Sequence, residues 1–540
     1  MMDRRRFLHL TSTAGLVVVA NPARLLTRAA TPTPGAVVQT TAGRVRGLLA
    51  DGVQTFKAIP YGASTAGARR FLPPIPVTPW TGVRDAFAFG PRSPQVLASF
   101  VPEWQPLTGT EPMSEDCLHL NVWTPGTTTG ARRPVMVWLH GGGYTGGSPA
   151  ALPYDGANLA RRHDVVVVSI THRLNVLGFI HLADLGGERF AGASNAGQKD
   201  IIAGLEWVRD NIDRFGGDPK SVTIFGQSGG AGKVSTLLGM PAAQGLFHRA
   251  IAQSGSAVTS MPASTATQNA EALMSRLGLK PNQADELQKM PVEQVLAAMQ
   301  APGGGRGGFA TSPVVDGASL PHDVFNPAAT PLSASIPLLI GSTETEVTWS
   351  VNTDYTAPAD AAALRTRIMR TLRVDDSRAQ SLVDVYRHGR PQASLLDLAL
   401  IMETDASQFR TGVDLEAERK SAAARAPVYM YRFQWYSPVS GGRLRAMHCM
   451  DIPFAFDNVD NSQAIVGGGA DRQALADKMS RAWVAFARGG DPSHAGLPRW
   501  EPFTASERST MMLNTECRLA HDPYRDERVA IAAAMASRGA

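Results

Sequence analysis

Cysteine is scarce in this chain. Cys117, Cys449 and Cys517 are the only cysteines among 540 residues, and three cysteines cannot build a disulfide framework. The sequence also contains no HExxH segment and no paired CxxC motif, so the usual clustered ligands of a hydrolytic metal site are missing. We therefore expect chemistry that uses neither a metal nor another cofactor.

Net charge is low once the N-terminus is set aside. The formal charge is +5, but residues 1–30 hold five arginines against Asp3 and so account for +4 of it. The remaining +1 gives residues 31–540 no net basic field that would attract nucleic acid or an anionic membrane surface. We expect no nucleic-acid partner.

The N-terminus has no apolar run long enough to span a bilayer. Arg4–Leu8 (RRRFL) precedes an apolar stretch over residues 10–20, which is shorter than the roughly 20 residues that a membrane helix needs. This pattern resembles a twin-arginine export signal over residues 1–30, with cleavage near Ala29 or Ala30; a structural amphipathic helix is the alternative. We expect a periplasmic or secreted protein without stable membrane insertion.

The most informative segment that is present runs from residue 215 to residue 230, FGGDPKSVTIFGQSGG. Ser221–Phe225 is β-branched and apolar, which predicts a buried strand. Ser228 follows in the segment GQSGG, with Gly226 two residues before it and Gly229 and Gly230 directly after it. Glycines allow the strained, crowded turn that lifts a serine hydroxyl above the start of a helix. The segment predicts a nucleophilic serine, with a plain structural turn in a glycine-rich loop as the alternative.

A second glycine-rich segment follows another predicted strand. Pro134–Leu139 reads as buried, and it leads directly into His140–Tyr144, HGGGY. Such a loop can direct the amides of Gly142 and Gly143 at an oxyanion, and each donor contributes on the order of 3 kcal/mol to catalysis. A flexible connector is the alternative to this prediction.

A phosphate-binding loop is a rival interpretation of the residues up to Lys233, GGAGK. The glycine that this motif requires five residues before Gly232 is Gln227, and Val234 follows the lysine in place of Ser or Thr. The spacing therefore excludes the motif.

Three motifs together carry a family resemblance: Glu115–Pro125 (EDCLHLNVWTP), the HGGGY loop and the serine segment with its preceding FGGDP. From about Val37 to about Tyr524 the chain resembles the type-B carboxylesterase family, cholinesterase-like α/β-hydrolases, and within it the bacterial para-nitrobenzyl esterases. The resemblance implies an α/β fold with a large, mostly parallel central sheet and helices on both faces. It also implies one catalytic domain over residues 36–540, with helical cap insertions at about 256–311 and 353–426.

The resemblance further implies a triad of serine, glutamate and histidine in that order along the chain. Ser228 is the expected nucleophile. Glu346 follows the predicted strand Ile336–Ile340 and matches the family's acid, with Glu344 as the nearby competitor. His448 lies in the segment that matches the family's histidine loop and would serve as the general base.

Other site positions follow from the same resemblance. The oxyanion donors would be the amides of Gly142, Gly143 and Gly229, the last at a position where the family usually has alanine. Ser254 and Asp451 match residues that often support the triad, although either could simply cap a turn.

The chain departs from the family pattern at several positions. Gln227 replaces a common glutamate, and no tryptophan lies within residues 107–114, which together argue against a choline ester. Cys449 replaces the usual glycine after the histidine. Ser93 stands where many relatives have the cysteine that bridges to the one matching Cys117, so the resemblance implies that this disulfide is absent.

The sequence thus predicts a serine hydrolase that cleaves small carboxylic esters through an acyl-enzyme intermediate. Three alternatives remain at this point: an amide or carbamate hydrolase using the same residues, a lipase acting at lipid interfaces, and a non-catalytic binding protein of the same fold. The oligomeric state is not specified by these patterns.

Overall fold

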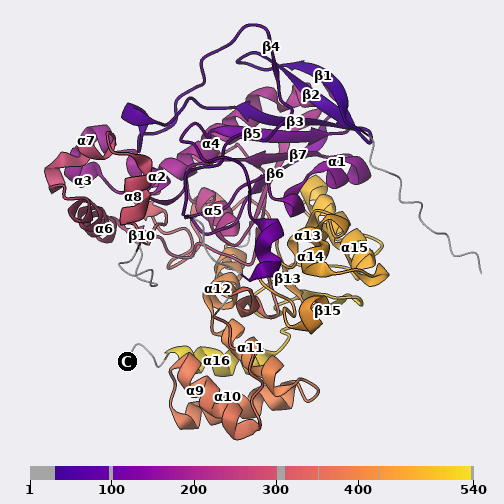
Figure 1. Cartoon of the computed structure of the whole chain (residues 1–540). Helices are drawn as coiled ribbons and strands as arrows, with labels where there is room; N and C mark the ends of the chain where they lie inside the picture. Colours follow the sequence, from indigo (N-terminus) through magenta and orange to yellow (C-terminus); the bar gives the residue numbers. More distant parts are fainter. Residues whose placement is uncertain (1–30, 97–100, 301–309, 351, 424, 537–540) are drawn as a thin grey trace, which may run out of the picture.

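A computed structural model describes residues 31–96, 101–300, 310–350, 352–423 and 425–536. The predicted export signal, residues 1–30, lies outside the described residues, as does the glycine-rich stretch Gly303–Gly308 of the first predicted insertion. Within the described part of the chain, one large twisted sheet runs through the molecule and helices cover both of its faces (Figure 1).

The main sheet has 13 strands in the described residues, in the order β1-β2-β3-β5-β7-β6-β8-β9-β12-β13-β14-β15, with β4 beside β2. Their bounds are β1 Thr33–Gln39, β2 Arg44–Ala50, β3 Val53–Pro60, β4 Val83–Asp85, β5 His119–Thr124, β6 Arg133–Leu139, β7 Val166–Ile170, β8 Gly217–Gln227, β9 Arg249–Gln253, β12 Leu338–Thr343, β13 Val428–Phe433, β14 Thr510–Leu513 and β15 Arg518–Ala520. A separate short parallel pair joins β10 Met261–Pro262 to β11 Val314–Val315.

The described α-helices lie between and around these strands. They are α1 Ala157–His163, α2 Asn175–Gly178, α3 Ala183–Gly186, α4 Ala196–Asn211, α5 Gly229–Leu237, α6 Ala263–Arg276, α7 Ala284–Leu287, α8 Val292–Ala298, α9 Ala361–Leu372, α10 Asp376–Gly389, α11 Leu395–Asp405, α12 Gln408–Ala422, α13 Ile452–Ala455, α14 Gln463–Val466, α15 Ala470–Gly489 and α16 Arg525–Ala536. None of these described helices is both long and apolar enough to cross a membrane.

The centre of the sheet is parallel, from β7 through β6, β8, β9, β12 and β13 to β14, whereas the neighbouring pairs at both ends are mainly antiparallel. This confirms the predicted α/β-hydrolase type of sheet. Strand β8 begins at Gly217, four residues before the predicted start at Ser221, because Gly217 still pairs with Arg133 across an irregularity in the ladder. The carboxyl ends of these parallel strands face one edge of the sheet, where α/β enzymes place their sites.

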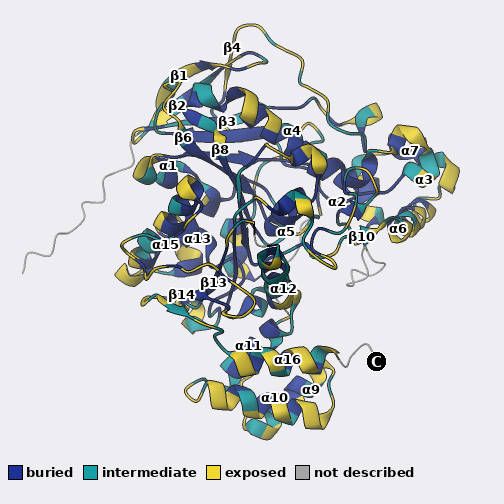
Figure 2. Cartoon of the chain, turned by 180° about the vertical axis from the view of Figure 1, so that it is seen from behind, coloured by how far each residue is buried: buried dark blue, intermediate teal, exposed yellow. Residues whose placement is uncertain are grey.

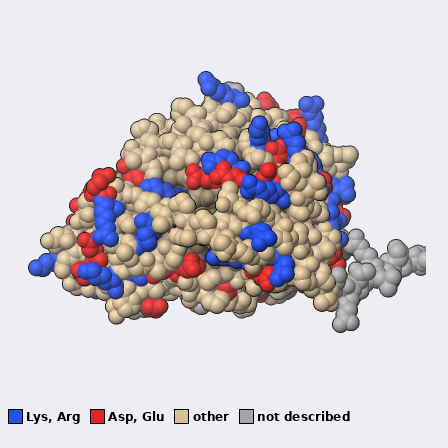
Figure 3. Space-filling view, turned by 90° about the horizontal axis from the view of Figure 1, so that it is seen from above, with Lys and Arg blue, Asp and Glu red and all other residues tan. Residues whose placement is uncertain are grey.

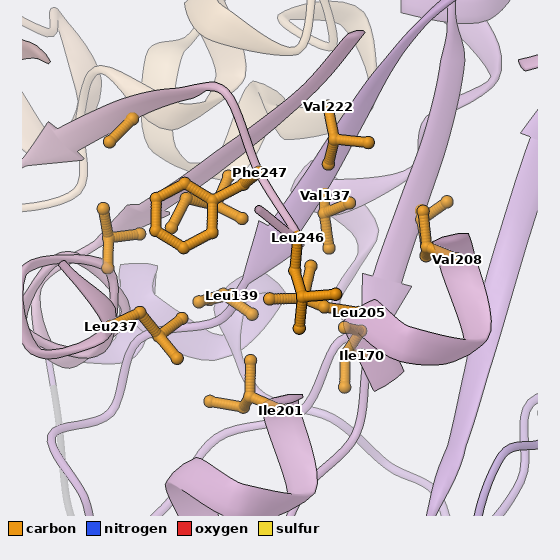
Figure 4. Close-up of a cluster of buried hydrophobic side chains, with 14 of the residues drawn as sticks. Val137, Leu139, Ile170, Ile201, Leu205, Val208, Val222, Leu237, Leu246 and Phe247 are labelled. Atoms are coloured by element: carbon orange, nitrogen blue, oxygen red, sulfur yellow. The ribbon is translucent and has the colours of Figure 1, made fainter. Parts of the chain in front are cut away.

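The core fills both faces of the sheet, which explains why the central strands are nearly continuous apolar runs. On β6, Val135, Val137 and Leu139 belong to one buried cluster, while Met136 and Trp138 belong to the cluster on the opposite face. The first cluster packs against α4, α5 and α12, and Figure 4 shows Val137 and Leu139 among residues of this cluster. The second packs against α1, α13 and α15.

Several helices within the two predicted insertions form small cores of their own. Helices α6, α7 and α8 pack around a cluster that also contains Phe71 and Phe190, and α9, α10 and α11 pack with α16. Both groups extend from the periphery of the sheet, with exposed outer faces (Figure 2). On the face seen in Figure 3, acidic and basic side chains are interspersed.

Ser93 offers a test of how the family's missing disulfide bears on stability. Its hydroxyl interacts with the buried Cys117 thiol, so the two positions are neighbours in this fold. We expect Ser93→Cys to form a disulfide with Cys117 after oxidation. By restricting the unfolded chain, the disulfide should raise the free energy of unfolding by about 3 kcal/mol. Urea unfolding with and without a reductant measures this, and equal midpoints in the two conditions would contradict it.

Candidate active site

The serine elbow has the strained geometry that its glycines predict. Ser228 sits between β8 and α5 with φ 58° and ψ −124°, and its amide donates to the carbonyl of Gln253 at 2.8 Å. A Cβ added to Gly226 would lie 2.6 Å from the backbone of Gly230, and one added to Gly230 would lie 2.0 Å from the carbonyl oxygen of Leu139. Only glycine fits at these two positions, so the turn is fixed by close backbone contact.

The HGGGY loop leaves β6 and passes directly over the elbow. Gly142 and Gly143 have φ values of 93° and 62°, which glycine adopts readily. Among the described residues, the amides of Gly142, Gly143 and Gly229 donate to no protein acceptor. Three donors without acceptors beside a serine are the arrangement that an oxyanion requires.

The carboxylate predicted for the triad reaches the histidine. His448 Nδ1 lies 2.5 Å from Glu346 Oε2, and both side chains are buried. The other carboxylate oxygen accepts from the amide of Thr343 at 2.7 Å. A bridge between Thr345 and Met447 joins the two loops that carry these residues. The contact fixes the imidazole so that its second nitrogen, Nε2, is the one available as a base.

The competing carboxylate has a different set of partners. Glu344 is buried and forms an ion pair with Arg390, and it also accepts from the side-chain amide of Gln434. Arg390 in turn binds Glu527 at 2.9 Å. Glu344 therefore belongs to a buried ion-pair network, which links β12 to α16, and it does not contact His448.

Ser228 and His448 line the same pocket, which has a volume of about 600 Å³. They share no direct hydrogen bond among the described contacts. Enzymes often form this hydrogen bond fully only in the complex with substrate, so Ser228 and His448 can still act together in catalysis.

The side-chain amide of Gln227 packs against the imidazole. Its Nε2 lies 3.3 Å from His448 Nε2 and 3.4 Å from His448 Nδ1. Nearly equal distances to both ring nitrogens place the amide over the ring, away from the in-plane lone pair of Nε2. The Cys449 thiol donates to Gln227 Oε1 at 2.9 Å. Two positions that depart from the family pattern are therefore in contact beside the base.

Aromatic residues that the sequence analysis did not select surround His448. The ring centroid of Phe409 lies 4.3 Å from the imidazole, and those of Trp104 and Trp349 each lie 6.1 Å away. All three line the pocket. Trp104 is just outside the window in which a tryptophan was sought, and Trp349 ends the short 3-10 helix that begins at Glu346. Trp349 could have been identified from the sequence because it lies three residues after Glu346. Phe409 is not close in sequence to any predicted site residue.

The two predicted supporting residues are differently placed. Asp451 is buried and accepts from the Tyr431 hydroxyl at 2.6 Å; burial raises the pKa of its carboxyl to about 6. Its charge acts on both Glu346 and His448 without direct contact. Ser254 is buried with φ 52°, and its hydroxyl has no hydrogen-bond partner among the described residues. In the described ranges no group of three or more His, Cys, Asp or Glu is placed to hold a metal.

Gly229 allows the oxyanion loop to approach the elbow closely. A Cβ at this position would lie 2.1 Å from the carbonyl oxygen of Gly143, which is backbone and cannot rotate away. We expect Gly229→Ala to displace the loop and lower kcat about 10- to 100-fold with a smaller change in KM, because oxyanion donors would lose alignment. Gly489→Ala is the control, since a Cβ there meets nothing within 4 Å. Unchanged ester turnover in Gly229→Ala would show that the close approach has no catalytic value.

Comparison with known proteins gives a consistent result over most of the chain. Residues 34–532 match the model of the Carboxylesterase family. The chain is 33% identical over 501 residues to a para-nitrobenzyl esterase of Bacillus subtilis (strain 168), which covers 91% of this chain and 97% of that protein.

Solved structures agree with this match. A carboxylesterase of Geobacillus stearothermophilus superposes with a TM-score of 0.77 at 37% identity, covering 92% of this chain and 99% of that one. An esterase from anaerobic Clostridium hathewayi, described as able to hydrolyze aliphatic aromatic polyesters, gives a TM-score of 0.80 at 32% identity and covers 93% and 100%.

Proposed function

Because the chain belongs to the carboxylesterase family and is a carboxylic ester hydrolase, we propose that Ser228, His448 and Glu346 are its catalytic triad. Ser228 Oγ attacks the acyl carbonyl while His448 Nε2 takes the hydroxyl proton. Glu346 holds the imidazole by its Nδ1–H and stabilises the positive charge that forms. The observation that carries this proposal is the 2.5 Å contact between His448 and Glu346 in the wall of a pocket that also contains Ser228.

The reaction then passes through two tetrahedral states. In each, the oxygen of the attacked carbonyl becomes negative and is held by the amides of Gly142, Gly143 and Gly229. His448 returns its proton to the departing alkoxide, which leaves the acyl group on Ser228. Water, deprotonated by the same imidazole, attacks this acyl-enzyme. The bond between the acyl carbon and Ser228 Oγ then breaks, Oγ takes the proton back from His448, and the acid is released. Every proton taken by the histidine is thus returned within one half-reaction.

The pocket supports small esters with an apolar or aromatic group as substrates. Phe409, Trp104 and Trp349 form one wall beside the base, where flat apolar groups pack favourably. Ser256, Ser260 and several glycines also line the pocket. Size and stacking at the aromatic wall would therefore discriminate between substrates.

Pre-steady-state kinetics with p-nitrophenyl esters test the proposed mechanism. An acyl-enzyme that accumulates predicts a burst of p-nitrophenol close to one equivalent per enzyme, followed by slower turnover. A matched panel in which the ester is replaced by an anilide or a carbamate separates ester hydrolysis from the two related chemistries. Faster turnover of the anilide or carbamate than of the ester would overturn the proposed preference.

We further propose that residues 1–30 direct export by the twin-arginine route to the periplasm or the medium. The basis is the RRRFL segment and the short apolar stretch that follows it. N-terminal sequencing of exported protein should begin near residue 30, whereas a start at Met1 would reject the signal.

A further inference from the structure

Lys233 is a buried cation that the proposed mechanism does not use. It lies on α5, the helix that follows the serine elbow, and it is fully inaccessible to solvent. Its Nζ donates to the carbonyl oxygen of His140 at 3.0 Å. Within the described residues no Asp or Glu forms an ion pair with it, and the undescribed segments between residues 31 and 536 contain no acidic residue. Among the described residues, this lysine therefore has no countercharge.

The groups around Lys233 are neutral near pH 7. The rings of His140 and His172 stack at 4.7 Å, and burial lowers the pKa of His140 to about 3 and that of His172 well below its usual value. The ammonium lies 5.7 Å from the ring centroid of Tyr144, whose pKa burial raises to about 12.

Glu416 of α12 is an acidic group that contacts α5, the helix of Lys233, through Ser235. Burial raises the pKa of its carboxyl to about 8, and its oxygens accept from the Ser235 hydroxyl and the Ala257 amide. Lys420 on the same helix is its charged neighbour. When Lys233 is protonated, its ammonium has no ion-pair partner among the described residues.

The acceptor of the lysine connects it to the oxyanion. His140 directly precedes Gly141, Gly142 and Gly143, so its carbonyl belongs to the peptide that begins the loop. A cation bound to this carbonyl polarises the peptide group, and it adds positive potential behind the loop, where low polarity leaves charges poorly screened. This positive potential would stabilise the negative charge that develops on the carbonyl oxygen of the substrate.

We propose that protonated Lys233 is a positioning residue of the oxyanion loop, which it holds and polarises through the His140 carbonyl so that the loop stabilises the tetrahedral state. The inference rests on the proposed ester hydrolysis at Ser228. It adds a charged group behind a site whose oxyanion donors are neutral amides.

The charge state of Lys233 gives the inference a signature in the pH profile. Burial lowers the pKa of Lys233 to about 7, so its ammonium is present below that pH and is lost as the pH rises through it. The general base, by contrast, becomes more active as the pH rises. We therefore expect kcat to decline on the alkaline side of neutrality, over a range in which the base alone would produce a plateau.

The test compares wild-type enzyme with Lys233→Met and Lys420→Met from pH 5.5 to 9.5. Lys420 is a matched control because it is also buried and its Nζ donates to a carbonyl, that of Ala334, at 3.3 Å. We expect Lys233→Met to lower kcat about 10-fold at pH 6 with little change in KM, and to remove the alkaline decline. Lys420→Met should retain the wild-type profile. An alkaline decline that persists in Lys233→Met would overturn the inference.

A second measurement uses wild-type enzyme alone, in case Lys233→Met does not fold. A trifluoromethyl ketone forms a hemiketal: Ser228 Oγ bonds to the ketone carbon, the hydroxyl proton passes to His448, and the ketone oxygen becomes the anion. We expect its affinity to fall about 10-fold between pH 6 and pH 9, and constant affinity would overturn the inference. Absence of ester turnover at every pH would instead reject the proposed function, on which the inference rests.

Discussion

Ser228→Ala should lower kcat for a p-nitrophenyl ester about 10⁵- to 10⁶-fold while leaving the fold intact. The loss is large because the serine, the histidine and the carboxylate act as a unit, and removing the nucleophile leaves only the oxyanion donors and substrate binding to accelerate hydrolysis. The variant should unfold close to the wild-type temperature. Ser228 donates a hydrogen bond to the carbonyl of Gln253 through its backbone amide, and alanine retains this amide.

Ser312→Ala is the matched control for this experiment. Ser312 lines the same pocket, and its hydroxyl has no hydrogen bond to a histidine in the described part of the chain. We expect its kcat to stay within a few-fold of wild type. A Ser228→Ala enzyme that retains more than a hundredth of the wild-type kcat, after contaminating esterase is excluded by a second purification, would reject Ser228 as the nucleophile.

Glu346→Gln should lower kcat about 10³- to 10⁴-fold. Glu346 uses one oxygen for His448 and the other for the amide of Thr343, so it needs two acceptors. Glutamine has only one, and it would leave either the imidazole wrongly oriented or a buried amide without a partner. Steady-state kinetics with a p-nitrophenyl ester measure the effect.

Glu344→Gln tests whether activity requires the Glu346 carboxylate in particular or is lost when any buried carboxylate near the end of β12 is removed. It removes the charge that pairs with Arg390, so we expect a loss of about 3 kcal/mol in the free energy of unfolding together with nearly normal kcat. Denaturant unfolding and ester kinetics on the same two variants provide both readouts. If Glu344→Gln lost more activity than Glu346→Gln, the assignment of the acid would be reversed.

The sequence was most informative where one continuous segment determines the geometry. The elbow could be predicted because the strand, the flanking glycines and Ser228 lie within sixteen residues, and the glycines are required by close contacts with one another, with the end of β6 and with the HGGGY loop. The acid was narrowed to two carboxylates at the end of β12. The structure puts only Glu346 beside His448, because Thr345 pairs with Met447.

Phe409 and Trp104, which line the pocket beside His448, could not be predicted from the sequence. Phe409 contacts His448 from α12, and Trp104 approaches from a segment more than 300 residues away in the chain, so neither has a local signal. No local signal in the sequence places the two insertions relative to the pocket. Helices α6–α8 and α9–α11 form separate clusters, whereas Ser256, at the start of the first insertion, and Gln408, within the second, line the pocket.

The sequence also could not show that two residues which differ from the family pattern contact each other. Gln227 and Cys449 were each recognised as unusual, but their mutual contact, with the amide over His448, depends on how β8 and the histidine loop meet. The close approach of Gly143 to Gly229 is of the same kind.

The most direct test of the account is a crystal structure of the enzyme inactivated by a fluorophosphonate ester. The account predicts phosphorus bonded to Ser228 Oγ, a phosphoryl oxygen within hydrogen-bond distance of the amides of Gly142, Gly143 and Gly229, and His448 Nε2 turned toward the serine oxygen. Phosphorus on another residue, or an imidazole that stays out of reach of Ser228 in the adduct, would contradict it.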